Sequence, residues 1–438
     1  MSRIATVHGR QVLDSRGRPT VEAEVILEDG TMGRASVPSG ASTGTHEAHE
    51  LRDGDEAVFG GLGVVSAVGH VNGEISDALR GHDVLDQAGA DALLRELDGT
   101  PALSRLGANA VLGTSLALCR ASAAATGQPL YRRIAELAGV SSPVLPMPMV
   151  NILSGGLHAG RGMDVQDFLA VPVAATSMLE AIHLAARVRN AAALVAADRG
   201  LPTLLADEGG ISPGCPTGRD ALEFLLTAIE RAGLEPGKDI AIAIDVAAAA
   251  LFDAGSGRYH LRREGRRVTT GDMIDMIASW VGDFPVVSVE DPLDEDDWAG
   301  WQVITSRIGD RVRLIGDDLF TTNLERLTRG VAQGCANGVL VKVNQNGTLT
   351  GTLEVVTAAR DAGYVPVVSA RSGETEDDLL ADLAVGTAAG QIKVGSMRSS
   401  ERLAKYNQLI RIAEDTAVEF AAAPRRGDWP AHAENVPA

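Results

Sequence analysis

The sequence predicts an α/β fold in which a βα barrel follows a smaller α+β domain. In residues 239–396, short apolar runs alternate with helix-length segments, a pattern typical of βα units and a parallel sheet. Residues 1–50 instead carry β-branched runs separated by turn signals, which indicates antiparallel strands. At 438 residues the chain is long enough for both units, and its 45% hydrophobic content is sufficient for their cores.

The two units are expected to meet at a stretch rich in proline. The segment PVLPMPMVN, Pro143–Asn151, is interpreted as a connector. We therefore predict an N-terminal domain over residues 1–135 and a barrel domain over residues 136–420. Residues 421–438 are interrupted by prolines, and we expect them to form a flexible tail.

Strands and helices are predicted in turn within the N-terminal domain. The β-branched runs predict strands at Ile4–Leu13, Thr20–Leu27 and Met32–Val37. A helical pattern follows over residues 63–127. Its alanine-rich part, Asn109–Thr126, has so few polar positions that we expect a buried helix.

The segment PSGASTGTHEA, residues 38–48, interrupts this periodicity. Its small hydroxyl residues and glycines are typical of a plain surface turn. The same composition also suits a mobile loop that closes over a site and supplies a Ser or Thr oxygen to a hard cation. Composition leaves both interpretations open.

Residues capable of chemistry end the apolar runs of the barrel domain. They are Asp245, Glu290, Asp317, Lys342, Arg371 and Lys393. Active sites of βα barrels lie at the carboxyl ends of the strands, so these side chains are predicted to converge. The chain has only four lysines among 39 basic residues, at positions 238, 342, 393 and 405. Lysine at two strand ends therefore indicates a need for a compact ammonium group that arginine cannot replace.

Two further segments carry candidate site residues. A glycine-rich loop with His158 precedes a strand-like stretch that holds Asp164, Gln166 and Asp167. The apolar run LPTLLADEGG ends at Glu208 before two glycines, which allow a tight exit from a strand. A structural histidine and a helix-capping glutamate are equally compatible with these positions.

Composition narrows the range of ligands and compartments. The net charge of −19 disfavours nucleic acid as the main ligand, because phosphate backbones bind basic surfaces. A small anionic substrate is compatible with this charge if metal ions or local basic residues reverse the field at the site. No apolar run approaches a membrane span and the first residues lack a signal-peptide pattern, so we expect a cytoplasmic protein without a membrane partner.

Taken together and in order, the motifs of the chain resemble the enolase family over almost its whole length. The motifs are PSGASTG, GGLHA, DVQDF, ADEGG, AIDVA, VEDPLDEDDW, IGDDLFTTN, VKVNQNG, SARSGETED, GTAAGQIKVGSM and AKYNQLIRI. The resemblance implies an enolase-type modified TIM (β/α)8 barrel with a smaller N-terminal α+β domain, assembled as a homodimer or higher homo-oligomer. It also implies magnesium-dependent removal of water from 2-phosphoglycerate, a small phosphorylated hydroxy acid, to give phosphoenolpyruvate.

The resemblance further implies a metal set and a catalytic base. Asp245, Glu290 and Asp317 would hold the Mg²⁺ ion that binds the substrate carboxylate, and their hard oxygen atoms suit that ion. Ser42 would bind a second Mg²⁺ that arrives with the substrate. Lys342 would remove the C2 proton, with its pKa lowered by the metals and the second lysine. The doubly charged enediolate so formed needs concentrated positive charge.

The remaining roles implied by the resemblance concern the two ends of the substrate. Glu208 would protonate the departing hydroxyl, and Lys393 would pair with the substrate carboxylate. Arg371 and Ser372 would bind the phosphoryl group, which matches the planar guanidinium fork. Asp167 would be a further catalytic residue, and His158 and Gln166 would complete the pocket.

Three residues depart from the pattern of many enolases. Leu157 replaces a glutamate before the loop histidine, and Ala370 replaces a histidine before Arg371. Asp167 replaces a second catalytic glutamate and is one methylene shorter, so we expect it to reach the leaving group only through water. Ala370 would open space at the phosphoryl end, and Arg161 would add a cation there.

These departures leave three functions open. The first is a divergent enolase acting on 2-phosphoglycerate. The second is a specialised relative that performs the same elimination on a phosphonate analogue, such as formation of carboxyphosphonoenolpyruvate in phosphonate antibiotic biosynthesis. The third is a catalytically retired binding or structural protein, which the retained lysines and carboxylates argue against.

Overall fold

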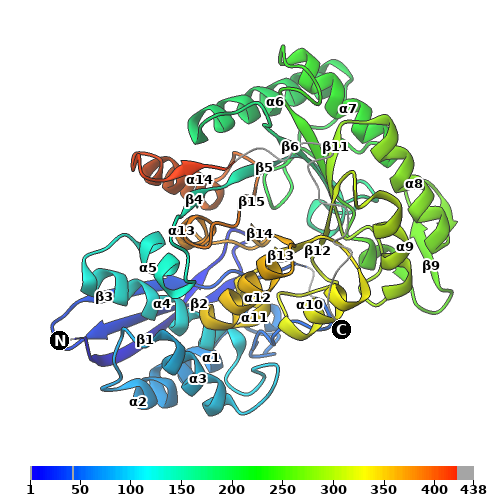
Figure 1. Cartoon of the computed structure of the whole chain (residues 1–438). Coiled ribbons are helices and arrows are strands. Elements are labelled where there is room, and N and C mark those ends of the chain that lie inside the picture. Colours follow the sequence, from blue (N-terminus) through cyan, green and yellow to red (C-terminus); the bar gives the residue numbers. More distant parts are fainter. Residues whose placement is uncertain (1, 42–43, 422–438) are drawn as a thin grey trace.

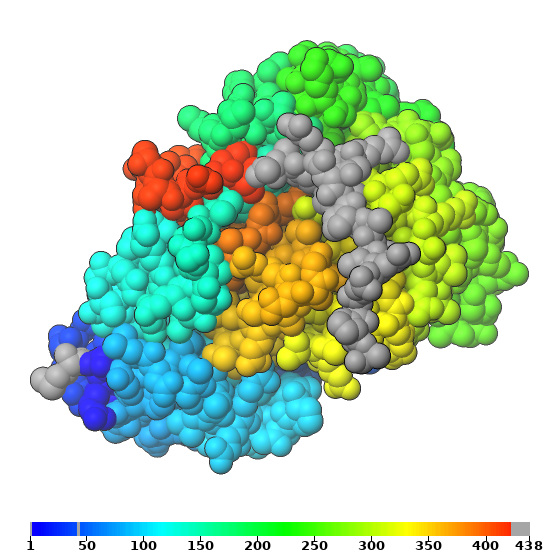
Figure 2. Space-filling model, in the orientation of Figure 1, coloured from blue at the N-terminus to red at the C-terminus, as the bar shows by residue number. Residues whose placement is uncertain are grey.

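The computed structural model describes residues 2–41 and 44–421 of the chain. A small N-terminal domain lies against one side of a closed barrel (Figure 1). The space-filling view shows this domain in contact with the segment that holds α11 (Val343–Asn346) and α12 (Leu349–Asp361) (Figure 2). The predicted domain limits at residues 135 and 420 stay a proposal.

The N-terminal domain begins with a three-stranded antiparallel sheet. Its strands β1 (Ile4–Leu13), β2 (Pro19–Leu27) and β3 (Met32–Ser36) lie in sequence order, as the β-branched runs predicted. The helices that follow are α1 (Val65–His70), α2 (Ser76–Leu79), α3 (Gln87–Asp98), α4 (Ala108–Thr126) and α5 (Leu130–Leu137). The 3-10 turn η1 (Phe59–Gly61) precedes α1, and the π-helical segment η2 (Val71–Ile75) follows it.

Helix α4 is the buried helix that the alanine-rich segment predicted. It packs against β2 and β3. The approach is so close that a Cβ atom on Gly33 of β3 would lie 2.2 Å from the backbone nitrogen of Ala121 and 2.3 Å from the carbonyl oxygen of Ala117. Glycine at this position therefore allows the helix to rest directly on the sheet.

Eight strands close the barrel in the order β11-β12-β13-β14-β15-β5-β6-β7, which confirms the predicted fold class. They are β5 (Met147–Ser154), β6 (Asp167–Val171), β7 (Ala241–Asp245), β11 (Val286–Glu290), β12 (Arg313–Gly316), β13 (Gly338–Val341), β14 (Val365–Ser369) and β15 (Gln391–Gly395). The helices are α6 (Met178–Asp198), α7 (Gly218–Arg231), α8 (Thr270–Asp283), α9 (Trp298–Ile308), α10 (Leu324–Gln333), α13 (Leu379–Gly386) and α14 (Ser400–Ile412), besides α11 and α12.

Short elements complete the described part of the chain. The pair β4 (Val144–Leu145) and β16 (Glu419–Phe420) joins the start of the barrel domain to its end. A small sheet contains β8 (Phe252–Asp253), β9 (Arg258–Leu261) and β10 (Arg266–Val268), and two 3-10 turns are η3 (Leu157–Ala159) and η4 (Ala248–Leu251). Among the described residues, no helix is both long enough and apolar enough to cross a membrane.

The apolar runs of residues 239–396 form parallel strands as predicted, and the antiparallel strand of the barrel lies outside that range. Strand β6 pairs antiparallel with both β5 and β7. Between β5 and β6 there is only the turn η3, and a connection without a crossover helix returns a strand in the opposite direction. The stretch predicted as one strand also divides, because Asp164 and Gln166 precede β6.

The proline-rich segment Pro143–Asn151 was wrongly predicted to be a connector. It forms β4 and most of β5, whose residues are all buried. Pro146 lies between the two strands, and Pro148 is the second residue of β5, near the strand start where proline is tolerated. The apolar residues of the segment decide its structure because they fill the barrel.

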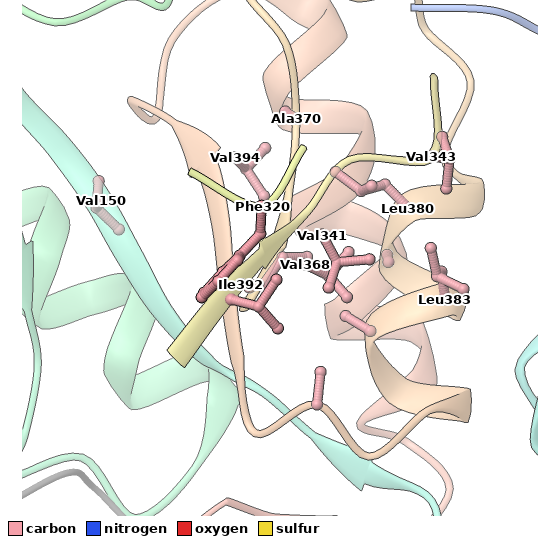
Figure 3. Close-up of a cluster of buried hydrophobic side chains, with 14 of the residues drawn as sticks. Val150, Phe320, Val341, Val343, Val368, Ala370, Leu380, Leu383, Ile392 and Val394 are labelled. Carbon is pink, nitrogen blue, oxygen red and sulfur yellow. The ribbon is translucent and has the colours of Figure 1, made fainter. Parts of the chain in front are cut away.

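Side chains alternate between the interior and the outside of the barrel. Leu340 and Val367 belong to the interior cluster, whereas neighbouring residues face the surrounding helices. Figure 3 shows Val341, Val368 and Ile392 gathered beside Leu380 and Leu383 of α13. This packing fixes strands β13, β14 and β15 against their helix layer.

Candidate active site

Three acidic residues lie at the same end of three adjacent strands. Asp245 is the last residue of β7, Glu290 is the last residue of β11, and Asp317 directly follows β12. All three are buried. The structure therefore brings together the acids that the sequence predicted to converge.

Two lysines bind these carboxylates directly. The Lys393 ammonium group donates to Asp245 Oδ2 at 2.6 Å and to both carboxylate oxygens of Glu290 at 2.7 Å. Lys342, which follows β13, donates to Asp317 Oδ2. Burial and the Asp245 carboxylate raise the pKa of Glu290 well above its usual range. Burial lowers the pKa of Lys393, but its carboxylate partners outweigh burial and raise it.

The electrostatic environment of Lys342 differs from the sequence-based expectation. We expected neighbouring cations to lower the pKa of this lysine. Burial does lower it, but the Asp317 carboxylate outweighs burial, so the pKa is raised. The expectation is therefore wrong for the ligand-free protein, because the nearest group to the ammonium nitrogen is an acid.

The carboxylate cluster fits a hard divalent cation. Beside Asp317 lie Asp291 and Asp318, and one ligand oxygen from each lies within 4.8 Å of the others. Asp291 accepts hydrogen bonds from the backbone N–H groups of Asp317 and Asp318 at 2.9 and 2.7 Å. Burial and the Asp317 charge raise the pKa of Asp318 to about 7. This excess of buried oxygen donors suits Mg²⁺, whereas Ser42 lies outside the described residues.

His158 lies between two carboxylates on another side of the site. Its Nε2 atom is 3.1 Å from Asp167 Oδ1, and its Nδ1 atom is 3.7 Å from Glu208 Oε1. Burial lowers the pKa of His158, but the Asp167 charge outweighs burial and raises the pKa to about 9. The imidazole is therefore held in its protonated form at neutral pH.

Asp167 contacts His158 through the imidazole Nε2 atom. Since β6 runs in reverse, Asp167 is its first residue and lies at the same barrel end as Asp245, with which it pairs. Its Oδ1 atom accepts hydrogen bonds from Asn151 at 2.6 Å and from Ser154 at 3.0 Å. Asp167 therefore contacts the site through His158, and burial raises its pKa.

Glu208 does not end a strand as predicted. It lies in the loop between α6 and α7, where the nearest sheet contact is an isolated bridge between Leu205 and Ile211. The Glu208 carbonyl oxygen accepts a hydrogen bond from the backbone N–H of Ser396 at 2.8 Å, just after β15. Burial raises the pKa of Glu208, but nearby cations, above all His158, outweigh burial and lower it.

Arg371 and Ser372 form a separate corner after β14. Arg371 donates from Nη1 to Asn344 Oδ1 at 2.8 Å and to Glu47 Oε2 at 3.0 Å, and from Nη2 to Glu47 Oε1 at 3.3 Å. The Ser372 hydroxyl accepts a hydrogen bond from Arg16 Nη1 at 3.3 Å. The loop over residues 38–48 therefore supplies an acid to the arginine proposed for phosphoryl binding.

These corners surround one small cavity of about 20 Å³, which is room for about one water molecule. The predicted site residues that line it are His158, Gln166, Glu208, Asp245, Lys342, Arg371, Ser372 and Lys393. Gln166 also donates to Asp245 Oδ2 at 3.0 Å. Glu290, Asp317 and Asp167 lie one layer behind the lining residues, to which their hydrogen bonds connect them.

The residues that depart from the enolase pattern differ in whether they line this cavity. Leu157 and Ala370 line the cavity, as expected for changes in its wall. Arg161 is exposed and does not line it, so the expectation that it adds a cation at the phosphoryl end is wrong.

Family models agree with this architecture over both parts of the chain. The model described as enolase, N-terminal domain matches residues 4–134, and the model described as enolase, C-terminal TIM barrel domain matches residues 142–426. The chain belongs to the enolase family.

Several residues of this enolase-family site were missed from the sequence. They are Glu47, Asp291, Asp318, Asn344, Gln345 and Glu374. Each lies within or directly beside a motif that carries a predicted residue, such as VED, GDD and VKVNQ. The available signal was adjacency to a strand end, which indicates proximity to the site without indicating a contact.

Proposed function

We propose that the chain is a magnesium-dependent hydro-lyase that converts 2-phosphoglycerate to phosphoenolpyruvate. The observation that carries this proposal is the pairing of two buried lysines with three strand-end carboxylates around one cavity. Elimination of water next to a carboxylate requires a base and a means to stabilise an enediolate. The two lysines and the acids supply both functions.

Lys342 is proposed as the base that removes the C2 proton. Its nitrogen lines the cavity and is hydrogen bonded to Asp317. Because that contact raises the pKa of Lys342, the lysine becomes an effective base only when another cation engages Asp317. Lys393 is proposed to pair with the substrate carboxylate in place of Asp245 and Glu290, which it binds in the ligand-free protein.

Magnesium fits the oxygen-only donor set of Asp245, Glu290 and Asp317, and we propose that these residues hold it. When bound, the ion supplies positive charge that stabilises the enediolate. Asp291 accepts a hydrogen bond from the backbone N–H of Asp317 and so holds Asp317 in position. Asp291 therefore supports this donor set, but we do not propose it as a ligand. The second ion and its proposed ligand Ser42 follow from the resemblance alone.

Glu208 is proposed to protonate the departing hydroxyl group. The pKa of Glu208 is lowered in the ligand-free protein, so the residue needs a proton source. Protonated His158 lies 3.7 Å away and is the nearest candidate donor. Asp167 holds the histidine from its other side, and Gln166 fixes the orientation of Asp245.

The test is direct formation of the enol phosphate. Purified protein with 2-phosphoglycerate and Mg²⁺ is expected to develop the ultraviolet absorbance of phosphoenolpyruvate, and a chelator is expected to abolish it. Absence of product at saturating substrate and metal would overturn the proposal. Product formation by a Lys342→Met variant at the wild-type rate would overturn the proposed base.

Ala370 favours a second candidate substrate class. It is buried in the cavity wall directly before Arg371, so a small side chain stands beside the proposed phosphoryl site. The extra room suits a phosphonate analogue that carries a carboxylate on phosphorus. Ala370→His is expected to raise activity on 2-phosphoglycerate if the alanine reflects drift, and to abolish activity on the analogue if it reflects specificity.

Two properties of the whole protein complete the proposal. We propose a cytoplasmic enzyme, which is the usual setting of the family's reaction. We also propose a homodimer or a higher homo-oligomer. Sedimentation velocity measures the second property, and a monomer at micromolar concentration would exclude it.

A further inference from the structure

One face of helix α14 points toward the loop that carries Arg371 and Ser372. Arg402, Lys405 and Tyr406 lie on this face, because residues three and four positions apart share one side of a helix. Arg402 is 0% exposed, Lys405 is 1% exposed and Tyr406 is 2% exposed. Two positive charges are thus completely removed from water, which is costly unless polar partners compensate them.

Arg402 compensates its burial by binding backbone carbonyl groups. Its Nη1 atom donates to the carbonyl oxygen of Arg371 at 2.7 Å and to that of Val394 at 3.0 Å, and Nη2 donates to the Ser372 carbonyl oxygen at 2.8 Å. One guanidinium group therefore ties the loop after β14 to strand β15.

Lys405 holds the same loop through an acid. Its Nζ atom lies 2.9 Å from Glu374 Oε2 and donates to the Thr375 carbonyl oxygen at 2.6 Å. The other carboxylate oxygen, Glu374 Oε1, accepts the backbone N–H of Arg371 at 3.0 Å. The backbone of Arg371 is consequently fixed at its N–H through Glu374 and at its carbonyl through Arg402.

The choice of residue types indicates a geometric function. Lys405 is one of only four lysines in the chain, and of these Lys342 and Lys393 line the cavity. The fourth, Lys238, has a side chain that is 73% exposed and pairs with Glu235 on the surface. A buried ion pair adds little stability compared with apolar packing, but it restricts the positions of its partners.

We propose that Lys405 and Arg402 are positioning residues that set the location of Arg371 and Ser372, and thereby the affinity for the phosphoryl end of the substrate. The inference rests on the proposed function, because it takes Arg371 to be the phosphoryl-binding residue. Neither residue lines the cavity, so both act through the loop.

The test compares phosphate binding in Lys405→Met and Lys238→Met, which remove one lysine charge each from a buried and an exposed position. Inorganic phosphate is the probe, titrated calorimetrically into the full-length protein, with Arg371→Met as the reference for a lost site. Lys405→Met is expected to weaken phosphate binding at least tenfold and to raise KM for 2-phosphoglycerate similarly. Mg²⁺ affinity and kcat at saturating substrate are expected to change less than threefold.

A double variant tests whether Lys405 acts on the Arg371 backbone through the Glu374 carboxylate. Adding Glu374→Gln to Lys405→Met keeps an oxygen for the Arg371 N–H and leaves no unpaired buried charge, so phosphate affinity is expected to return to within threefold of wild type. If Lys405→Met does not fold, Arg402→Lys carries the test, since the single nitrogen of the shorter lysine cannot occupy both the Nη1 and the Nη2 positions of the guanidinium group. It is likewise expected to weaken phosphate binding about tenfold.

Three results would overturn the inference. Wild-type phosphate affinity and KM in folded Lys405→Met would do so while leaving the proposed function intact. Wild-type phosphate affinity in folded Arg402→Lys would do the same. A wild-type protein that binds no phosphate and forms no phosphoenolpyruvate would overturn both the inference and the proposed function.

Discussion

The two ends of the candidate site are built in different ways. The carboxylate end consists of Asp245, Glu290, Asp317, Lys342 and Lys393, and each is within or directly after a barrel strand. The proposed phosphoryl end consists of Arg371 and Ser372, which lie on a loop held by α14, by Arg16 and by Glu47. Closure of the barrel fixes the first end, whereas the second depends on segments distant in sequence.

This difference separates chemistry from binding. A side chain at a strand end is positioned by the hydrogen-bonded ladder, so a substitution there leaves the backbone in place and removes the chemical group together with its ion pair. A side chain on a supported loop loses its position when any support is removed. Changes at the carboxylate end should therefore lower kcat, and changes at the phosphoryl end should raise KM.

The largest expected effect is at the carboxylate end. Lys342→Met should lower the rate of C2 proton exchange by about a thousandfold or more, since a positioned base contributes about 10²–10⁴-fold. Exchange is measured by nuclear magnetic resonance in deuterated buffer. Lys238→Met is the matched control and should exchange normally. Wild-type exchange in Lys342→Met would mean that the two ends do not divide chemistry from binding.

At the phosphoryl end, Arg371→Lys should lower kcat/KM by about 10–100-fold, mainly through KM. Loss of a hydrogen bond to a charged group costs about 1.5–3 kcal/mol, and lysine cannot reproduce the guanidinium fork. Initial-rate kinetics on 2-phosphoglycerate separate the two constants. A fall in kcat with unchanged KM would contradict the assignment of this end to binding.

A smaller effect is expected from His158, which belongs to neither end. Its pKa is raised from 6.5 to about 9 in the folded protein, so its stabilising contribution is complete below pH 6.5 and is lost as pH rises through 9. The difference in unfolding free energy between wild type and His158→Gln should fall by on the order of 2 kcal/mol across this range. Urea unfolding at several pH values measures it.

The matched control for this titration is His183→Gln, because His183 is exposed on α6. Its unfolding free energy should differ little from that of wild type, because substitutions of exposed side chains usually change stability little. A pH-independent difference between wild type and His158→Gln would show that the Asp167 contact does not stabilise the protonated imidazole.

The smallest effect is expected from Arg161→Ala. The side chain is exposed and does not line the cavity, so kcat and KM should each change less than twofold. A tenfold rise in KM would extend the phosphoryl end beyond the loop after β14.

The carboxylate end of the site was easier to predict from the sequence than its surroundings. Hydrophobic periodicity and composition locate the strands. Asp245, Glu290 and Lys342 end or follow such strands, and the strand ends meet at one end of the barrel. Periodicity and composition do not reveal the direction of β6, because alternating apolar residues look the same in parallel and antiparallel strands. Pro146 and Pro148 suggested a connector, because proline cannot donate a hydrogen bond to a sheet. Burial of the neighbouring apolar residues outweighed that loss, and the segment forms strands.

The contacts of the phosphoryl end could not be predicted from local patterns. The Glu47 carboxylate meets Arg371 across more than three hundred residues of sequence, and Arg402 binds carbonyl groups that any loop possesses. The raised pKa of Lys342 in the ligand-free protein could not be predicted for a related reason. Its value depends on the distance to Asp317, which only the folded chain determines.

The reversed strand β6 restricts how this enzyme family member can vary. At the other barrel strands, a rim side chain is followed by a loop whose length can change without disturbing the ladder. Asp167 opens its strand and is bracketed by ladder partners Ser154 and Asp245. A one-residue slip of β6 against these partners would turn Asp167 and every later side chain of the strand to the opposite face. The register of β6 is thus as tightly constrained as any side chain in the pocket.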